Sequence, residues 1–565
     1  MNTYPWNAVY SLTSPNVRRS DILATPAASK TKENAVAILR TCPFDGVFNL
    51  TKKILSSLGV DLTAKYSAYD MAFADLDQVL ADKVKCVVVW IDWRLLGKDA
   101  SAHTYLSHLI QRIRLHHNGP IVVNNWPTKS SSQTILSGLP SNPINHFRTL
   151  NAELIALAKE TNDLVIADLD DLLSLTEWYD SRNDKEFNLP FSAKAEIKVS
   201  QHLGLQLFGS IFKDPIRAVI LDLDNTMYEG ILGEDGLEGI KFKPEHQVLW
   251  KMIEQLKKDG KLIAISSKND ERDVFAMFER YKNSLPLKKE DFTIIAANWN
   301  SKAKNISEII DTFNFSEKYV LFLDDNPKEV LEVKETFPDL NIIQVNPLDF
   351  KKTTEVLSYY PGVYQIQEDK ARDKRSQDIK ANIARKEASV NFADSASYLT
   401  SLEMNISIHS NKAHDFERMV ELARKTNQFN LSLKRTTAEE LNSIKNQGGG
   451  YLSISLKDKY SDSGNIGGFI YSVNSRTLIL EEILLSCRAL GRFVEHIALK
   501  TFLTQMQGSA EHLFFKVTKG ERNEPALTWF NSLGFKANEE IPIAEALAKL
   551  DKLIPAVEFK LNLEG

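Results

Sequence analysis

The sequence predicts a multidomain α/β protein in which helices cover both faces of parallel sheets. Short apolar runs recur along the first two thirds of the chain, and amphipathic stretches long enough for helices separate them. The chain has 565 residues, enough for about three domains, and its 43% hydrophobic and 25% charged residues are ordinary for a globular protein. We therefore expect domains at 1–214, 215–364 and 396–565, with a charged helical linker over 365–395.

Composition excludes several classes of protein. A net charge of −5 gives no support for nucleic-acid binding as the main activity. The three cysteines, Cys42, Cys86 and Cys487, are too few and too scattered for a disulfide framework or a zinc site. The first residues lack the basic start and apolar core of a signal peptide, and no apolar run approaches the roughly twenty residues that span a bilayer. We expect a cytoplasmic protein without a membrane segment.

The first domain is predicted to contain a parallel sheet. Its expected strands cover 34–39, 85–91, 120–124 and 163–167, with helical stretches between them. Cys42 follows the first of these strands. We favour a packed thiol over a reactive one at this position, because free cysteine is among the most buried residue types.

The middle domain carries an acid pair, Asp222 and Asp224, directly after the apolar run Ala218 to Leu221. A buried strand that delivers two acids to its carboxyl end builds the usual ligand position of an open α/β sheet. Two neighbouring carboxylates repel each other unless a cation lies between them. Mg²⁺ favours one or two protein carboxylates together with phosphate oxygens, so the pair predicts a magnesium site.

Three further motifs follow predicted strands in the same domain. The first is Ser266-Ser267-Lys268-Asn269, the second contains Lys302 and Lys304, and the third is Asp324-Asp325. Acid pair, hydroxyl, lysine and acid pair are what Mg²⁺-dependent phosphoryl transfer through an aspartyl phosphate requires. Each gap between motifs holds about one helix, which leaves no room for a large cap domain. An uncapped site suits a bulky or protein-borne phosphorylated substrate.

These four motifs, in this order, resemble those of the haloacid-dehalogenase (HAD) superfamily. The resemblance implies that Asp222 is the nucleophile and Asp224 the general acid/base. Ser267 is preferred to Ser266 as the phosphate-binding hydroxyl, and Lys302 to Lys304 as the motif lysine. The implied phosphate-binding residues are Thr226, Ser267, Lys268, Asn269 and Lys302, and the implied metal ligands are Asp222, Asp224, Asp325 and Asp324, with Asp325 favoured as the direct distal ligand.

Weaker resemblances cover the two flanking domains. The first domain is similar to the SGNH-hydrolase fold, but Arg40-Thr41-Cys42-Pro43 stands where a Gly-Asp-Ser nucleophile would be, so we interpret it as a degenerate, non-catalytic relative that serves docking or dimerisation. The last domain resembles the GNAT acyltransferase fold, whose Arg/Gln-x-x-Gly-x-Gly/Ala loop holds a pantetheine pyrophosphate at a helix N-terminus. Here the loop runs from Arg488 to Phe493, and Phe493 occupies the second glycine position.

A strand is predicted to run into a helix at 486–492, in the same region as Cys487. Positive charge from the flanking arginines and a helix N-terminus would lower the thiol pKa and make Cys487 a nucleophile. A packed thiol beneath a turn is the alternative.

Together, the motifs LDLDNTMYEGILGEDG, SSKND, NWNSKAKNI, FLDDNP, KTNQFNLS and SCRALGRFVE resemble the FkbH-like family, HAD subfamily IIIC. The resemblance implies an enzyme that loads a glyceryl unit from 1,3-bisphosphoglycerate onto the phosphopantetheine of an acyl carrier protein, with Mg²⁺, in polyketide biosynthesis. It implies Cys487 as the acyl nucleophile and an acyl/pantetheine site made of Asn427, Arg488, Gly491, Arg492 and Glu495.

Three alternatives stay open. The chain is a phosphatase acting on a small phosphate ester, with the last domain for assembly only; or it transfers acyl groups in polysaccharide or sugar biosynthesis; or it is a scaffold with vestigial sites. A homodimer is compatible with each.

Overall fold

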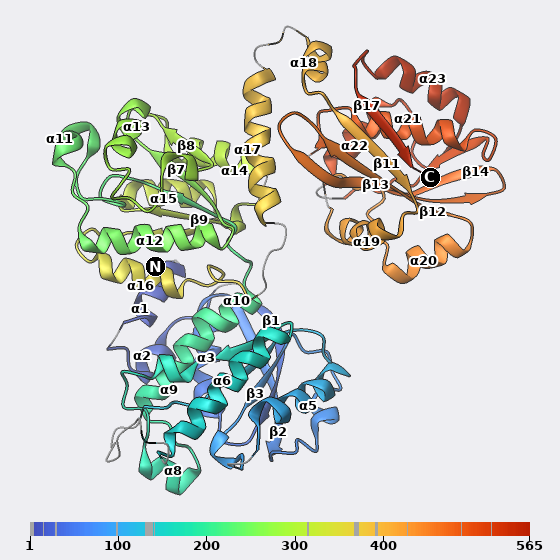
Figure 1. Ribbon diagram of the computed structural model, residues 1–565. Coiled ribbons are helices and arrows are strands. Elements are labelled where there is room, and N and C mark those ends of the chain that lie inside the picture. Colours follow the sequence, from blue (N-terminus) through green and yellow to red (C-terminus); the bar gives the residue numbers. More distant parts are fainter. Residues whose placement is uncertain are drawn as a thin grey trace. The chain divides into compact units, whose positions relative to one another are not determined.

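The computed structural model describes residues 5–14, 16–28, 31–97, 100–129, 139, 142–313, 316–366, 372–389, 392, 394–426, 428–486, 489–520 and 523–564. The chain forms two compact units. Unit 1 is Met1–Asp311 with Phe315–Lys370, and unit 2 is Thr312–Asn314 with Ala371–Gly565. Unit 1 contains two five-stranded sheets and unit 2 one seven-stranded sheet (Figure 1). The expected multidomain α/β class is confirmed, while the domain limits near 214 and 364 stay predictions.

The first sheet of unit 1 is parallel, with strand order β2-β1-β3-β4-β5. The strands are β1 (Lys32–Arg40), β2 (Val60–Tyr69), β3 (Cys86–Trp90), β4 (Ile121–Asn124) and β5 (Leu164–Ala167). The four strands predicted for this domain are confirmed as β1, β3, β4 and β5. The sequence did not reveal β2, because only Val60, Leu62 and Ser67 of this edge strand are buried and it lacks a continuous apolar run.

Helices cover both faces of this first sheet. Val36 and Ile38 of β1 pack into one core, and Ala37 and Leu39 pack into the other. The larger helices are α3 (Asp45–Ser57) and α9 (Ala193–Gln201) on one face, and α5 (Ala102–Arg114) and α6 (Ile144–Glu160) on the other. The shorter helices are α1 (Pro5–Leu12), α2 (Arg19–Ala24), α4 (Leu76–Val79), η1 (Trp93–Leu95), α7 (Leu169–Leu172), α8 (Ser181–Phe187), η2 (His202–Leu207) and α10 (Phe208–Phe212).

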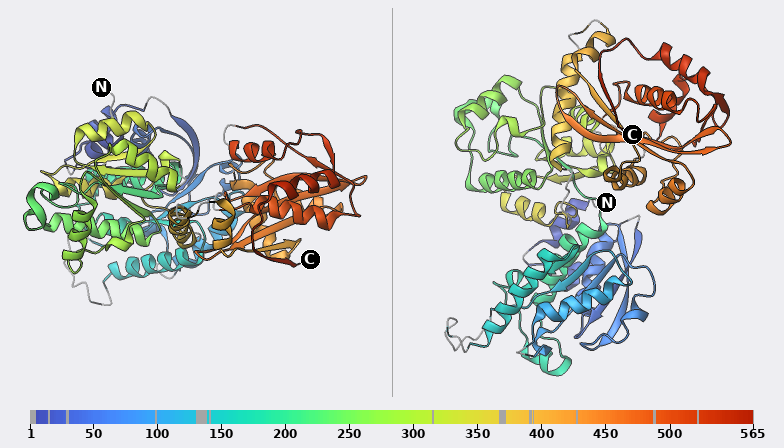
Figure 2. Two further views of the ribbon diagram at one scale, coloured as in Figure 1. Left: turned by 90° about the horizontal axis from the view of Figure 1, so that it is seen from above. Right: turned by 45° about the vertical axis from the view of Figure 1, so that its right-hand side comes forward.

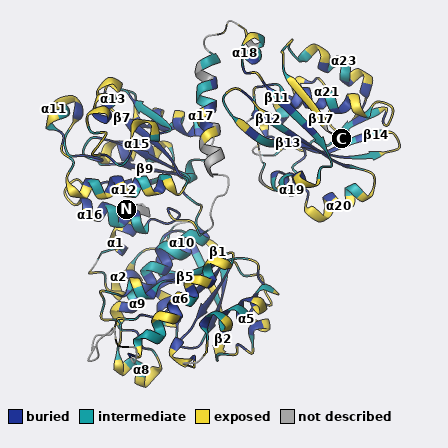
Figure 3. Ribbon diagram, in the orientation of Figure 1, coloured by how far each residue is buried: buried dark blue, intermediate teal, exposed yellow. Residues whose placement is uncertain are grey.

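The second sheet of unit 1 is also parallel, with strand order β10-β9-β6-β7-β8. Its strands are β6 (Ala218–Leu221), β7 (Leu262–Ser267), β8 (Ile294–Ala297), β9 (Val320–Asp324) and β10 (Asn341–Gln344), and β6, β7 and β9 are buried along their whole length (Figure 3). The helices are α11 (Leu232–Gly239), α12 (Pro244–Lys258), α13 (Glu271–Arg280), η3 (Lys289–Asp291), α14 (Lys302–Phe313), η4 (Glu317–Tyr319), α15 (Pro327–Thr336) and α16 (Phe350–Tyr359).

No large cap interrupts this second sheet. Only α11 and α12 lie between β6 and β7, and only α13 and η3 lie between β7 and β8, in a stretch that the structure describes throughout. The edge of the sheet where the strands end is therefore not covered by an inserted domain.

Unit 2 is built on a mixed sheet of order β16-β15-β14-β13-β12-β11-β17. Its strands are β11 (Asn405–Ser410), β12 (Gly450–Lys457), β13 (Asp462–Asn474), β14 (Thr477–Leu485), β15 (His512–Phe515), β16 (Glu540–Pro542) and β17 (Lys560–Glu564). The helices are α17 (Arg372–Ser389), α18 (Ser395–Ser401), η5 (Ala413–Asp415), α19 (Phe416–Lys425), α20 (Ala438–Asn446), α21 (Val494–Met506), α22 (Glu524–Ser532) and α23 (Ile543–Leu553). Helices lie against both faces of this sheet (Figure 2), and each face has its own apolar core.

The strand-to-helix transition predicted at 486–492 lies between β14, which ends at Leu485, and α21, which begins at Val494, so the helix starts two residues later than expected. Gly491 and Phe493, just before it, both have positive φ, of 76° and 58°. A left-handed backbone at these two positions keeps helical geometry from beginning earlier there. No helix among the described residues is long and apolar enough to cross a bilayer.

Helix α17, expected as a solvated linker, is anchored in unit 2. Arg385 of α17 donates to both carboxylate oxygens of Asp458, each at 2.8 Å, and Arg492 donates to Asp458 Oδ2 at 2.5 Å. All three side chains are nearly or wholly buried. Asp458 therefore holds two buried guanidinium groups, one from α17 and one from the loop before α21.

We expect Asp458→Ala to lower the free energy of unfolding of unit 2 by about 3–5 kcal/mol, because it leaves two buried guanidinium groups with no shared carboxylate. Chemical denaturation monitored by circular dichroism measures the change. Asp462→Ala, at an exposed position on the neighbouring strand, is the control, and we expect it to change stability by no more than about 0.5 kcal/mol. An equal effect of both substitutions would contradict the assigned role.

Candidate active site

The four sequence motifs of the middle domain meet at one edge of the second sheet. Asp222 directly follows β6, Ser267 ends β7, and Asp324 ends β9. Lys302 is the first residue of α14, after the loop that follows β8. Because β9, β6 and β7 are neighbouring parallel strands, their carboxyl ends lie side by side, and the motif residues converge there.

Lys302 is the lysine of this site. Its ammonium donates to the carboxylate of Asp222 and to the backbone carbonyl of Ser266, and it lies 3.3 Å from Asp324 Oδ2. Only 3% of the side chain is exposed. Burial acts to lower the lysine pKa, but the carboxylates of Asp222 and Asp324 outweigh it and raise that pKa, so the ammonium stays charged. Lys304, the alternative, is exposed.

Three carboxylates gather around this lysine. Oxygen atoms of Asp222, Asp324 and Asp325 all lie within 4.8 Å of one another. Burial, and then the neighbouring Asp222 carboxylate, raise the pKa of Asp324 to about 7 and that of Asp325 to about 6. Apart from the Lys302 ammonium, 3.3 Å away, the buried Asp324 Oδ2 has no hydrogen-bond partner among the described residues. One ammonium does not balance three carboxylates, so this group fits a divalent cation with oxygen preference such as Mg²⁺.

Asp224, which the resemblance also placed among the metal ligands, is not brought into that group. Its Oδ1 accepts hydrogen bonds from the hydroxyl of Tyr228 at 2.7 Å and from the backbone N–H of Leu232 at 3.0 Å. Its Oδ2 accepts from Asn269 Nδ2 at 2.9 Å. These three donors fix the orientation of the carboxyl group, which would suit the acid/base role that the motif resemblance implies for Asp224.

Tyr228 was missed by the sequence reasoning as a site residue. Its side chain is fully buried, and burial followed by the Asp224 charge raises the pKa of its phenol, so the hydroxyl keeps its proton for the bond to Asp224. The available signal was a tyrosine four residues after an acid. That spacing alone does not predict a contact between the two side chains, because the contact depends on the tight turn at Asn225, where φ is 51°.

The predicted phosphate-binding residues divide into two groups. Ser267 is buried and its Oγ accepts from Asn269 Nδ2 at 3.0 Å, which leaves the hydroxyl proton for a phosphoryl oxygen. Thr226 instead accepts from the backbone N–H of Asp325 at 3.1 Å, and its hydroxyl lies 3.4 Å from Asp325 Oδ1, so it braces a metal-site loop. The ammonium of Lys268 is paired with Glu329.

The expected acyl site of unit 2 is described only in part, because Asn427, Cys487 and Arg488 lie outside the described residues. Arg492, expected to bind ligand, is buried and paired with Asp458, so it supports the loop. Gly491 and Phe493 have a left-handed backbone, with φ of 76° and 58°.

The first turn of α21 holds polar atoms without partners. Glu495 Oε2 and His496 Nδ1 are buried and have no hydrogen-bond partner among the described residues, and neither has the indole nitrogen of Trp529. His496 Nδ1 lies 3.3 Å from Glu495 Oε1. Glu495 was predicted for this site, whereas His496 and Trp529 were not, and isolated residues of these types give no sequence signal.

At the corresponding sheet edge of the first domain, charged side chains pair with one another. Arg94 pairs with the buried Asp92 at 2.6 Å and with Asp184 at 2.6 Å. Burial raises the pKa of Cys42 to about 12, which matches the packed-thiol interpretation.

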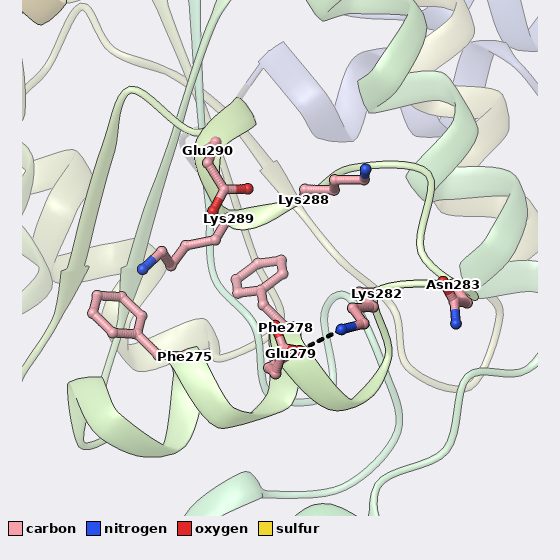
Figure 4. Close-up of a pocket in the computed structure, with 8 residues that line it drawn as sticks. All are labelled: Phe275, Phe278, Glu279, Lys282, Asn283, Lys288, Lys289 and Glu290. Carbon is pink, nitrogen blue, oxygen red and sulfur yellow. Dashed lines mark hydrogen bonds and ion pairs between the residues drawn. The ribbon is translucent and has the colours of Figure 1, made fainter.

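The middle domain also has a pocket of 480 Å³ (Figure 4). Phenylalanine and charged side chains from α13, from η3 and from the loop between them line it. Because η3 directly precedes β8, the pocket lies toward the edge where strands begin, opposite the carboxyl-end site.

No family model and no curated protein matches this chain. Among solved structures, it is similar to the N-terminal, phosphatase-domain-containing part of a Bacteroides fragilis protein complexed with Mg, at 20% identity over 64% of this chain and 100% of that one, with a TM-score of 0.48. It is also similar to a predicted HAD-like family hydrolase from Porphyromonas gingivalis, at 15% identity over 23% of this chain and 90% of that one, with a TM-score of 0.19. A GNAT family acetyltransferase from Brucella melitensis in complex with acetyl-CoA is similar at 12% identity over 24% of this chain and 88% of that one, with a TM-score of 0.18. Similarities at these identities and TM-scores do not establish the function of this chain.

We expect Mg²⁺ affinity to fall as pH falls. A carboxyl group binds the cation only after losing its proton, and the pKa values of Asp324 and Asp325 are raised to about 7 and about 6, so protons compete with Mg²⁺ in the neutral range. The apparent Kd should rise at least about tenfold from about pH 8 to about pH 5.5, as measured by calorimetry. Asp325→Asn should flatten this dependence. An apparent Kd that is the same at both pH values would contradict the metal assignment.

We expect Tyr228→Phe to lower kcat about tenfold, because it removes one of three hydrogen bonds that orient the Asp224 carboxyl. KM and the Kd for Mg²⁺ should change little, since Asp224 lies outside the three-carboxylate group. Steady-state phosphatase kinetics and Mg²⁺ titration measure these quantities. Tyr281→Phe, whose hydroxyl bonds the Leu237 carbonyl in the same domain, is the control. A loss of Mg²⁺ affinity equal to the loss of kcat would assign Tyr228 to the metal site instead.

Proposed function

We propose that this chain is a Mg²⁺-dependent phosphatase of the HAD type coupled to an acyltransferase. The observation that carries the phosphatase part is the buried Asp222 carboxylate, paired with Lys302 and grouped with Asp324 and Asp325 at the carboxyl edge of a parallel sheet. A nucleophile, a lysine and a cation site at one sheet edge are the parts that phosphoryl transfer requires.

The residues of the site suggest the following steps. Asp222 attacks phosphorus, the bond from phosphorus to the leaving oxygen breaks, and Asp224 gives its proton to that oxygen. Asp224 then takes a proton from water, whose oxygen attacks the aspartyl phosphate and releases inorganic phosphate and the free Asp222 carboxylate. Ser267 and Lys302 hold the phosphoryl oxygens throughout. Mg²⁺ bound by Asp222, Asp324 and Asp325 would neutralise phosphoryl charge.

The edge of the site supports a large substrate. No cap domain is inserted between β6 and β8, a stretch described throughout, and Trp299, in the loop between β8 and Lys302, is 74% exposed. Ile231, after the first acid pair, is 38% exposed. Large apolar side chains exposed beside a catalytic group are typical of surfaces that receive a partner. We infer that the phosphoryl group arrives on a bulky or protein-borne molecule.

The acyl part of the proposal is a transfer of a three-carbon glyceryl unit to an acyl carrier protein. The Cys487 thiolate would attack the acyl carbon of 1,3-bisphosphoglycerate and displace the 1-phosphate. The remaining phosphate would leave through Asp222, and the phosphopantetheine thiol of the carrier would then take the glyceryl group by thioester exchange. The motif resemblance supports these steps, together with the left-handed loop at Gly491 and Phe493 before α21.

A plain phosphatase for small esters is the second candidate. The buried ion pair of Arg492 with Asp458 favours it, because this arginine is then not free to bind a pantetheine group or to activate a thiol.

We expect Asp222→Asn to lower Mg²⁺-dependent hydrolysis of a generic phosphate ester by about 10³-fold or more, since the nucleophile is removed. Lys302→Met should have an effect of similar size, whereas Lys304→Met, two residues away and exposed, should retain activity. Phosphate release with and without a chelator measures these rates. Wild-type protein that hydrolyses no ester with Mg²⁺ would contradict the phosphatase assignment.

Transfer is tested by the intact mass of a phosphopantetheinylated carrier protein after incubation with this protein, Mg²⁺ and freshly generated 1,3-bisphosphoglycerate. We expect a glyceryl mass shift with wild type that is lost with Asp222→Asn and with Cys487→Ala. Phosphate release without a mass shift would favour the plain phosphatase.

A further inference from the structure

A second cluster of potential metal ligands lies in unit 2, at the end of strand β11. It consists of His409 on β11 and of His414 and Asp415 on the following turn η5. One ligand atom from each residue lies within 4.8 Å of the other two. The phosphatase and acyl-transfer steps proposed above use none of these three residues.

The distances suit a small tetrahedral cation. His409 Nδ1 lies 3.0 Å from Asp415 Oδ2, and His414 Nε2 lies 3.5 Å from the same oxygen. Two ligand atoms bound tetrahedrally to Zn²⁺ at its usual bond lengths are about 3.4 Å apart. The observed separations lie on either side of this value, so small side-chain adjustments would admit the ion.

The carboxylate of this cluster is held by outer hydrogen bonds. Ser453 Oγ donates to Asp415 Oδ2 at 2.6 Å, and Asn465 Nδ2 donates to Asp415 Oδ1 at 3.0 Å. Asp415 and Ser453 are buried. Asn465 Oδ1 is itself buried and has no donor among the described residues, an unmet acceptor of the kind that a metal-bound water satisfies. Such outer partners orient ligands in metal sites.

We propose that His409, His414 and Asp415 form a Zn²⁺ site whose remaining position is open to solvent. Two imidazoles and one carboxylate prefer Zn²⁺ and similar transition metals to Mg²⁺. His414 is 68% exposed, which gives the ion a path from solvent. To bind the metal through Nδ1, His409 would take the tautomer that carries its proton on Nε2, so that the Nδ1 lone pair faces the ion.

The proposed ion would join separate parts of the sheet. Its ligands come from β11 and η5, and the outer hydrogen bonds come from β12 and β13. The ion would therefore fix the start of α19 against three neighbouring strands.

The test uses the full-length, tag-free chain after chelator treatment. Zn²⁺ binding is measured by equilibrium dialysis with metal analysis, in excess Mg²⁺ so that the three carboxylates of unit 1 are occupied, and it is repeated in the Asp325→Asn background. We expect one Zn²⁺ per chain, and His414→Ala should weaken binding by at least about tenfold. Because His414 is exposed, the metal-free variant should unfold at the same temperature as wild type.

His116→Ala is the matched control. His116 also lies close to a carboxylate, 3.2 Å from Asp77, but no second imidazole joins that pair. This variant should bind Zn²⁺ like wild type. Co²⁺ should give the intense absorption of a four-coordinate ion in wild type and in His116→Ala, but not in His414→Ala. Wild type that binds no Zn²⁺ in excess Mg²⁺, or equal binding by wild type and His414→Ala, would overturn the proposal.

Discussion

The buried pair of Asp222 and Lys302 is the interaction on which the candidate site depends. A lysine this deep in the protein costs free energy unless carboxylates surround it, and three carboxylates in turn exceed the charge of one lysine. Without a metal ion, the site therefore has more negative than positive charge. A divalent cation would balance the excess negative charge, and the phosphoryl group of the proposed substrate would then bind beside it.

Much of the middle domain could be predicted because its signals are local. Continuous apolar runs predict buried parallel strands, and acids or hydroxyls directly after them predict a shared edge. Asp222, Ser267, Asp324 and Asp325 stand at such strand ends, and Lys302 follows a fourth strand. The resemblance to the HAD motifs was needed to prefer Ser267 over Ser266 and Lys302 over Lys304.

Features that depend on side-chain direction or on pairing between distant parts of the sequence could not be predicted. Asp224 turns toward Tyr228 and Asn269 instead of the metal group, and no spacing rule separates these two orientations. The edge strand β2 lacks an apolar run. Arg385 was read as part of a charged linker because its partner, Asp458, lies 73 residues away in the sequence. Charge alone does not reveal whether an arginine faces water or a buried carboxylate.

The shared carboxylate of Asp458 has a consequence for how the chain can be divided. Residue 396 looks like a natural start for an independent C-terminal domain, since a globular pattern begins near there. A fragment cut at that point would keep Asp458 and Arg492 but lose Arg385 and the whole of α17. In such a fragment, Asp458 would pair with Arg492 alone. A fragment that begins before α17 would retain the complete network and the helix that covers it.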